Sequence, residues 1–142
     1  MAVLQSAIAL VVDAALGVWL GSIVFFSFVA APRIFDVLGS DRAGPVVNAI
    51  FPTYYLFGLA LGLVALAGGV VAAFTGAATA LPWVFLPAVG AGVVMNAYAR
   101  FVLIPKMEAA GDDAFQTYHR QSVALNGLTM LAIAVALVVS HL

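Results

Sequence analysis

The chain has 142 residues, of which 65% are hydrophobic and 8% are charged, and its formal net charge is −1. A soluble domain carries about 25% charged residues, so a water-soluble fold could not hide this much apolar surface, and lipid is the expected solvent. The net charge argues against nucleic acid as a partner, and the absence of cysteine excludes disulfides, thiolate metal sites and cysteine catalysis.

Four long apolar stretches predict four transmembrane helices, because one span needs about 20 apolar residues for a bilayer core of about 30 Å. These stretches use most of the chain, so we expect a single domain over residues 1–142. The predicted fold is all-α, a polytopic membrane four-helix bundle. Its helices are expected at about 3–31, 52–75, 81–104 and 114–140.

The first helix is predicted to end at Pro32, because proline disfavours helix in the residue before it. This helix is longer than one bilayer crossing and is expected to tilt or project. No cleavable signal peptide is expected. Residues 1–7 lack a positive charge, and the apolar stretch is too long for a signal sequence.

A mixed apolar and charged segment, 32–51, separates the first two helices. It is typical of a short amphipathic element at the membrane interface. We expect it to be broken at Gly39 and again at Gly44-Pro45. The second helix is then predicted to begin with Pro52 at its first position.

The third helix is expected to begin near Trp83, which suits the aromatic belt of a membrane interface, and to end before Pro105. In the following loop Asp113 and Gln116 have the spacing of a capping box. The fourth helix is therefore predicted to start inside this loop.

All five positive residues fall in two stretches that the four spans bring to one side of the membrane: Arg33, Arg42, Arg100, Lys106 and Arg120. By the positive-inside rule this side is the cytoplasm. We therefore predict a cell-membrane protein with loops 32–51 and 105–113 in the cytoplasm and both termini outside.

Small residues at helical spacing predict where helices pack, because lipid gives no hydrophobic drive for helices to associate. The candidates are Gly17 and Gly21 on the first helix, Gly58 and Gly62 on the second, and Gly92 on the third. The bilayer is the expected surrounding partner, and a homo-oligomer is a further expectation.

Polar residues in the cytoplasmic half allow two interpretations. They hold helices together by hydrogen bonds, or they line a polar cavity open to the cytoplasm. Arg100 either snorkels to the interface or binds a carboxylate or an anionic ligand. His119 either bonds a loop carbonyl or acts as a titrating group or a ligand. The candidate cavity residues are Tyr54, Asn96, Arg100, His119, Ser122 and Asn126.

Asp13 is the acidic residue that lies apart from the positive side. It is expected to face the bundle, since it shares a helical face with Gly17 and Gly21. Its alternative partners are His141, water at the outer rim, its own proton or a bound cation. Asp13 is therefore a candidate proton or cation site.

Catalytic and cofactor motifs are missing from the sequence. His119 and His141 lie 22 positions apart, about 33 Å along one helix, which is too far for a shared haem. We find no zinc-ligand cluster, phosphate-binding loop or serine nucleophile elbow. We therefore predict no cofactor, no metal and no catalytic residue. An enzyme that acts on a lipid or a quinone ranks behind the functions that involve no catalysis.

Two segments resemble the family of transmembrane protein 205 and its prokaryotic relatives, a domain of unknown function (DUF4149). They are FVAAPRIFDVLGSDRAGPVVNAIFPTYY from Phe28 to Tyr55 and FQTYHRQSVALN from Phe115 to Asn126. The resemblance implies a four-pass membrane protein with a loose association with resistance to metal-containing drugs, and so with export. It also implies a signature site made of Pro32, Gly44, Phe51, Pro52, Tyr54, His119, Ser122 and Asn126.

These observations lead to one functional expectation and one alternative. The expectation is an integral membrane protein that binds or passes a small solute through a polar cavity on the cytoplasmic side. Four helices are few for an alternating-access transporter, so passage would require a homo-oligomer. The alternative is a structural or accessory scaffold without catalytic or transport activity.

Overall fold

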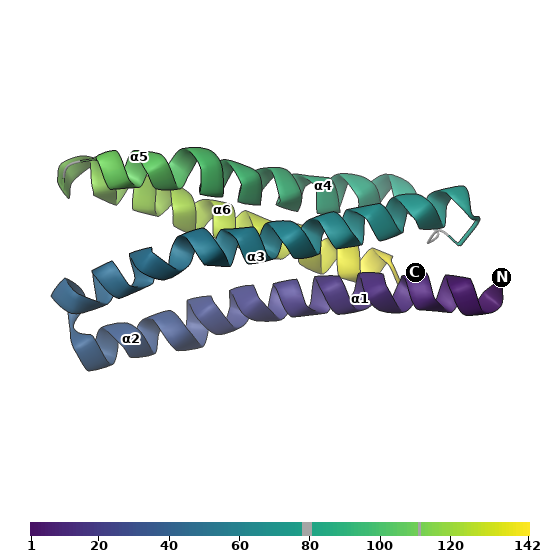
Figure 1. The fold of residues 1–142 in the computed structure, drawn as a ribbon, viewed down its shortest axis with the longest axis horizontal. Coiled ribbons are helices and arrows are strands. Elements are labelled where there is room, and N and C mark those ends of the chain that lie inside the picture. The colour runs from purple at the N-terminus through teal and green to yellow at the C-terminus, as the bar shows by residue number, and fades with distance from the viewer. Residues whose placement is uncertain (78–80, 111) are drawn as a thin grey trace.

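The computed structural model describes the backbone of residues 1–77, 81–110 and 112–142, and their side chains outside 112–116. Within this part of the chain every regular element is a helix, and the helices form one elongated bundle (Figure 1). The predicted all-α four-helix architecture is confirmed. The capping box predicted at Asp113 and Gln116 lies outside the described side chains.

The first long helix runs without a break from Ala2 to Leu38. It consists of α1 (Ala2–Phe25), a π-helical turn η1 (Phe26–Ala30) and α2 (Ala31–Leu38). The predicted end at Pro32 is wrong. A π turn widens the helix by one residue, which removes the clash that a proline ring makes with the carbonyl four residues earlier. The helix ends instead at Gly39, whose positive φ of 74° suits glycine.

The second long helix, α3 (Ser40–Phe74), starts directly after this glycine. Pro45 and Pro52 lie inside it, so the predicted break at Gly44-Pro45 and the predicted start at Pro52 are wrong. The amphipathic stretch between the first two helices is therefore built into α2 and the first turns of α3. Only its break at Gly39 is present.

The second half of the chain repeats this plan. The third long helix consists of α4 (Pro82–Tyr98), a π-helical turn η2 (Ala99–Leu103) and α5 (Ile104–Ala109). Its predicted end before Pro105 is wrong for the same reason as at Pro32. The fourth helix is α6 (Asp112–Val139).

A short sequence repeat underlies the two π turns. Phe28-Val29 and Phe101-Val102 are each followed, after two apolar residues, by proline and a basic residue. Each copy places its proline second in the α-helix that follows a π turn. The chain therefore consists of two helical hairpins that use the same device to carry a long helix past a proline.

The hairpins pack so that α1 lies beside α3 and α6, and α4 lies beside the same two helices. Both termini lie at one end of the bundle, and the α2–α3 junction and α5 lie at the other end (Figure 1). All five positive residues belong to the half that contains α2 and α5. The positive residues that the sequence groups in two stretches therefore lie together in one half of the folded bundle.

All four long helices are apolar and long enough to cross a bilayer, with 37, 35, 28 and 23 residues in the described spans. The protein is therefore a multi-pass membrane protein. A helix of 37 residues is about 55 Å long, so it extends well beyond a hydrocarbon core of about 30 Å.

Trp19 fills the centre of the bundle and is 1% exposed. It sits in a hollow formed by glycines of two neighbouring helices. An added Cβ at Gly62 or Gly92 would lie 2.8 Å from the indole ring, and one at Gly58 would lie 2.6 Å from the indole nitrogen. These three glycines are needed because a larger residue would occupy the space of the ring.

Gly17 and Gly21 differ from the expectation for packing glycines. Both are exposed on the outer side of α1, and a Cβ at either position would meet nothing within 4 Å. Spacing alone put them on one helical face with Asp13, but it could not tell whether that face is turned toward a neighbouring helix of this chain.

The packing of glycines around Trp19 predicts that two Gly→Ala substitutions on different helices have opposite effects on stability. Gly92→Ala should destabilise the protein by about 1–3 kcal/mol, because the new methyl group overpacks the indole ring. Gly17→Ala should leave stability unchanged or raise it slightly. Thermal unfolding of the purified variants in detergent measures both, and equal melting temperatures would contradict this packing.

Candidate functional site

A chain of hydrogen bonds joins three helices in the half of the bundle that holds the positive residues. Tyr54 of α3 donates its hydroxyl to Oδ1 of Asn126 on α6 at 2.6 Å. Nδ2 of Asn126 in turn donates to Oγ of Ser27 in η1 at 2.8 Å. Both ends of one amide are thus satisfied by helices that are distant in sequence, which fixes the orientation of the Asn126 side chain.

A second pair of bonds lies next to this chain. Oγ of Ser122 lies 2.6 Å from the Tyr55 hydroxyl, and either oxygen can be the donor. Nδ2 of Asn96 on α4 donates to the backbone carbonyl of Tyr55 at 3.3 Å. Tyr55, Ser122 and Asn96 are all buried, so these contacts are cross-helix bonds of the kind that hold membrane bundles together.

Aromatic rings surround the polar chain. The ring centroid of Phe26 lies 4.9 Å from that of Tyr54 and 5.9 Å from that of Phe51. The Phe51 and Tyr55 centroids are 5.9 Å apart. Because these rings come from both η1 and α3, they fix the side chains of the first hairpin around the hydrogen-bonded amide.

An open groove of about 540 Å³ runs along this cluster, between the η1–α2 part of the first helix and α6. Its polar lining includes Ser27, Tyr54, Ser122 and Asn126. Its outer walls carry apolar side chains that are well exposed, with Phe28 at 65% and Val123 at 60%. We refer to this space as the α1–α6 groove, where α1 stands for the whole first long helix, whose η1 and α2 parts line the space.

The candidate cavity residues fall into two groups. Tyr54, His119, Ser122 and Asn126 line the α1–α6 groove. Asn96 and Arg100 do not belong to its lining. Asn96 is 4% exposed and lies behind Tyr55, to which it is bonded.

Arg100 is placed differently from the other candidates. Its guanidinium carbon lies 5.5 Å from the ring centroid of its neighbour Phe101, within cation–π range. Its Nε is buried and has no hydrogen-bond partner among the described residues. The side chain therefore lies over the ring of Phe101 and takes no part in the groove lining.

Sequence reasoning missed several groove residues, above all Ser27 and the phenylalanines of the first helix. Ser27 was passed over because a single serine in an apolar helix is common. The signal that could have found this region is the concentration of Phe25, Phe26, Phe28 and Phe35 just before and after Pro32. Aromatic residues are enriched in binding pockets.

The groove offers uncharged hydrogen-bonding groups on its floor and apolar surface on its walls. Among the described residues no group of three histidine, cysteine, aspartate or glutamate side chains could hold a metal ion. The arrangement thus suits an amphipathic molecule with an uncharged polar head. Asp36 and His119 also line the groove.

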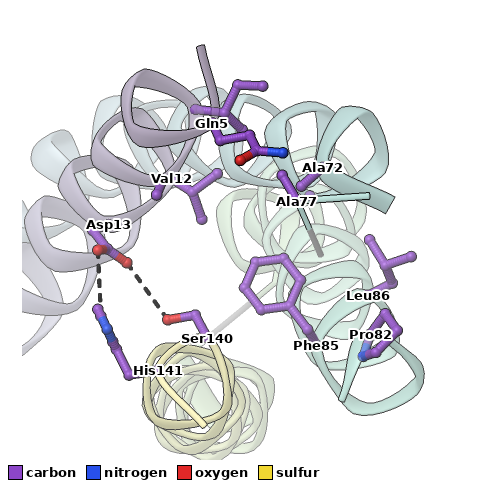
Figure 2. Close-up of a pocket in the computed structure, with 13 residues that line it drawn as sticks. Gln5, Val12, Asp13, Ala72, Ala77, Pro82, Phe85, Leu86, Ser140 and His141 are labelled. Atoms are coloured by element: carbon purple, nitrogen blue, oxygen red, sulfur yellow. Dashed lines mark hydrogen bonds and ion pairs between the residues drawn. The ribbon is translucent and has the colours of Figure 1, made fainter. Parts of the chain in front are cut away.

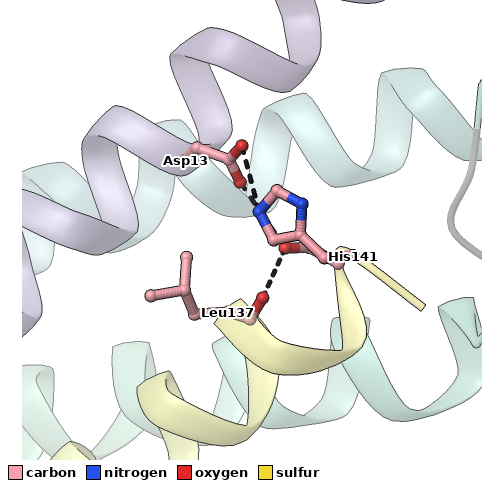
Figure 3. Close-up of polar contacts among 4 residues, drawn as sticks. Asp13, Leu137 and His141 are labelled. Carbon is pink, nitrogen blue, oxygen red and sulfur yellow. Dashed lines mark hydrogen bonds and ion pairs between the residues drawn. The ribbon is translucent and has the colours of Figure 1, made fainter.

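A second polar site lies at the opposite end of the bundle. Nε2 of His141 lies 3.3 Å from Oδ2 of Asp13 (Figure 3). Ser140 donates to Oδ1 of Asp13 at 3.5 Å and to the carbonyl of Leu137 at 2.7 Å. His141, one of the alternative partners considered for Asp13, is therefore its neighbour.

Comparisons with known proteins find similarity to a family and to a relative. A family described as "Domain of unknown function (DUF4149)" matches residues 14–116. An uncharacterized protein from Aquifex aeolicus (strain VF5) is 34% identical over 116 residues, which cover 80% of this chain and 81% of the relative. No solved structure gives a significant match.

The hydrogen-bonded chain predicts coupling between Tyr54 and Asn126. We expect Tyr54→Phe and Asn126→Ala each to lower stability, and the double variant to lose less than the sum, with a coupling of about 0.5–1.5 kcal/mol. Unfolding free energies of the four proteins in one detergent give this value. If the losses of unfolding free energy in the two single variants add up to the loss in the double variant, the two side chains do not share a bond.

Proposed function

The chain belongs to the family described as domain of unknown function DUF4149, and we propose that this integral membrane protein binds a small amphipathic molecule in its α1–α6 groove. The observation that carries the proposal is the polar chain of Ser27, Asn126 and Tyr54 in the lining of an open groove whose other lining residues are mostly apolar. Hydrogen bonds would hold the head of the ligand, and the walls would hold its apolar part.

The groove opens between helices in a part of the bundle whose outer surface is apolar. Phe28 and Val123, with exposures of 65% and 60%, stand on opposite sides of it. Lipid therefore supplies a direct route for an amphipathic molecule into the groove. The proposal includes no catalytic step.

Binding is better supported than passage through a single bundle. Trp19, Leu16, Val89 and Ile133 are each no more than 1% exposed, and they fill the layer between the groove and the opposite end. The resemblance to transmembrane protein 205 links the proposal with export, but passage would then need a second copy or a movement of this layer.

A scaffold role is the second candidate, and one observation favours it. Gly17 and Gly21 form a glycine pair at spacing four on the outer side of α1, with open space in front of both. Such pairs let another transmembrane helix approach closely. Such a partner helix can come from a second copy of the chain.

We propose the cell membrane as the location, with the positive end of the bundle in the cytoplasm. The gathering of all five lysine and arginine residues in the half that contains α2 and α5 supports this orientation. The α1–α6 groove would then lie in the cytoplasmic half, and both termini outside.

Blocking the groove should abolish ligand binding. In nanodiscs, a diazirine-bearing decanol should label residues of the α1–α6 groove, and excess decanol should compete. Val123→Trp should reduce this competed labelling at least tenfold, because the indole fills the groove mouth. Mass spectrometry of the labelled peptides measures the effect.

The matched control is Val138→Trp, which puts the same side chain on α6 at an equally exposed position, 61% against 60%, outside the groove lining. Labelling of this variant should equal that of the wild type. The proposed binding function would be contradicted if labelling were spread evenly over the lipid-facing surface and were equal in both variants.

The orientation has its own test, helped by the lack of native cysteine. Ser40→Cys, next to the α2–α3 turn, should react with a membrane-impermeant maleimide only after the cells are opened. Leu81→Cys, before α4, should react in intact cells. The reverse pattern would contradict the proposed topology.

A further inference from the structure

A pocket of about 130 Å³ lies at the end of the bundle where the termini meet (Figure 2). It shares no lining residue with the α1–α6 groove. Its polar groups come from Gln5, Asp13, Ser140 and His141. We propose that this pocket binds a primary or quaternary ammonium group. The group can belong to a small free amine or to the headgroup of a phospholipid.

Asp13 gives the pocket its negative charge. Asp13 lies in an apolar helix, and its side chain is 33% exposed. Its neighbours among the described residues are His141 and Ser140, and no lysine or arginine side chain lies within ion-pair distance. All five lysine and arginine residues belong to the other half of the bundle. Because no lysine or arginine neutralises this carboxylate, a cation is the ligand with complementary charge.

The walls of the pocket distinguish an organic cation from a metal ion. Calcium and magnesium need about six oxygen ligands, whereas most of this lining is apolar, including Val12, Phe85 and Leu86. Figure 2 shows the Phe85 ring projecting into the space between Asp13 and the wall formed by Leu86 and Pro82. A carboxylate together with an aromatic ring is the combination that recognises ammonium groups.

The size and position of the pocket agree with this ligand. Pockets for drug-sized molecules measure about 300–1,000 Å³, so 130 Å³ suits a headgroup or a small amine. Pro82 lines the pocket, and the next residue, Trp83, is 86% exposed. Tryptophan marks the interfacial belt of a membrane. The pocket therefore lies at the depth of the lipid headgroups.

Two measurements on the full chain in maltoside detergent test the proposal. Calorimetric titration with choline and with ethanolamine tests the free amines. Native mass spectrometry after exposure to a mixture of phosphatidylethanolamine and phosphatidylglycerol tests the headgroup source. We expect the wild type to bind at least one amine or to retain phosphatidylethanolamine preferentially, and Asp13→Asn to lower that binding at least tenfold.

The matched control is Asp41→Asn, the same change at an exposed carboxylate near the start of α3, which should bind like the wild type. A readout that needs no variant is the rate at which a carbodiimide modifies Asp13 in the wild type, which the bound ammonium compound should slow. Equal binding by the wild type and Asp13→Asn, or binding of neither source by the wild type, would overturn the proposal. Neither test involves the α1–α6 groove. The outcomes of these tests are therefore independent of whether the groove binds a ligand as proposed.

Discussion

The packing of Trp19 against three glycines is the contact on which the rest of the bundle depends. The indole ring of α1 reaches α3 at Gly58 and Gly62 and α4 at Gly92. In lipid, close approach of this kind supplies much of the energy of helix association. It also closes the middle of the bundle, so that the two ends of the molecule become separate sites with different chemistry.

The sequence was sufficient for the number of helices, their apolar character and the grouping of positive charge, because each follows from composition along the chain. It was insufficient for the helix ends. Pro32 and Pro105 were interpreted as stops, but each follows a π turn that accommodates it. A π turn is a hydrogen-bonding choice with no residue signature of its own, so only the paired Phe-Val motif hints at it.

The candidate site was predictable where polar residues were spaced along one face of α6, as with His119, Ser122 and Asn126. Periodicity places residues on a face, but it cannot tell which neighbour that face meets. Arg100 was therefore grouped with a groove that it does not line, and Gly17 was assigned to a helix contact that the described residues of this chain do not make. Ser27 was missed because its role depends on Asn126, 99 positions away.

The central claim is that the α1–α6 groove holds an amphipathic molecule with its head on Asn126. An experimental structure of the protein in lipid nanodiscs tests this claim most directly. We expect elongated density in the groove, with one end within hydrogen-bonding distance of Asn126, Tyr54 or Ser27 and the rest between Phe28 and Val123. A groove closed by direct contact between η1 and α6, with no room for a ligand, would contradict it.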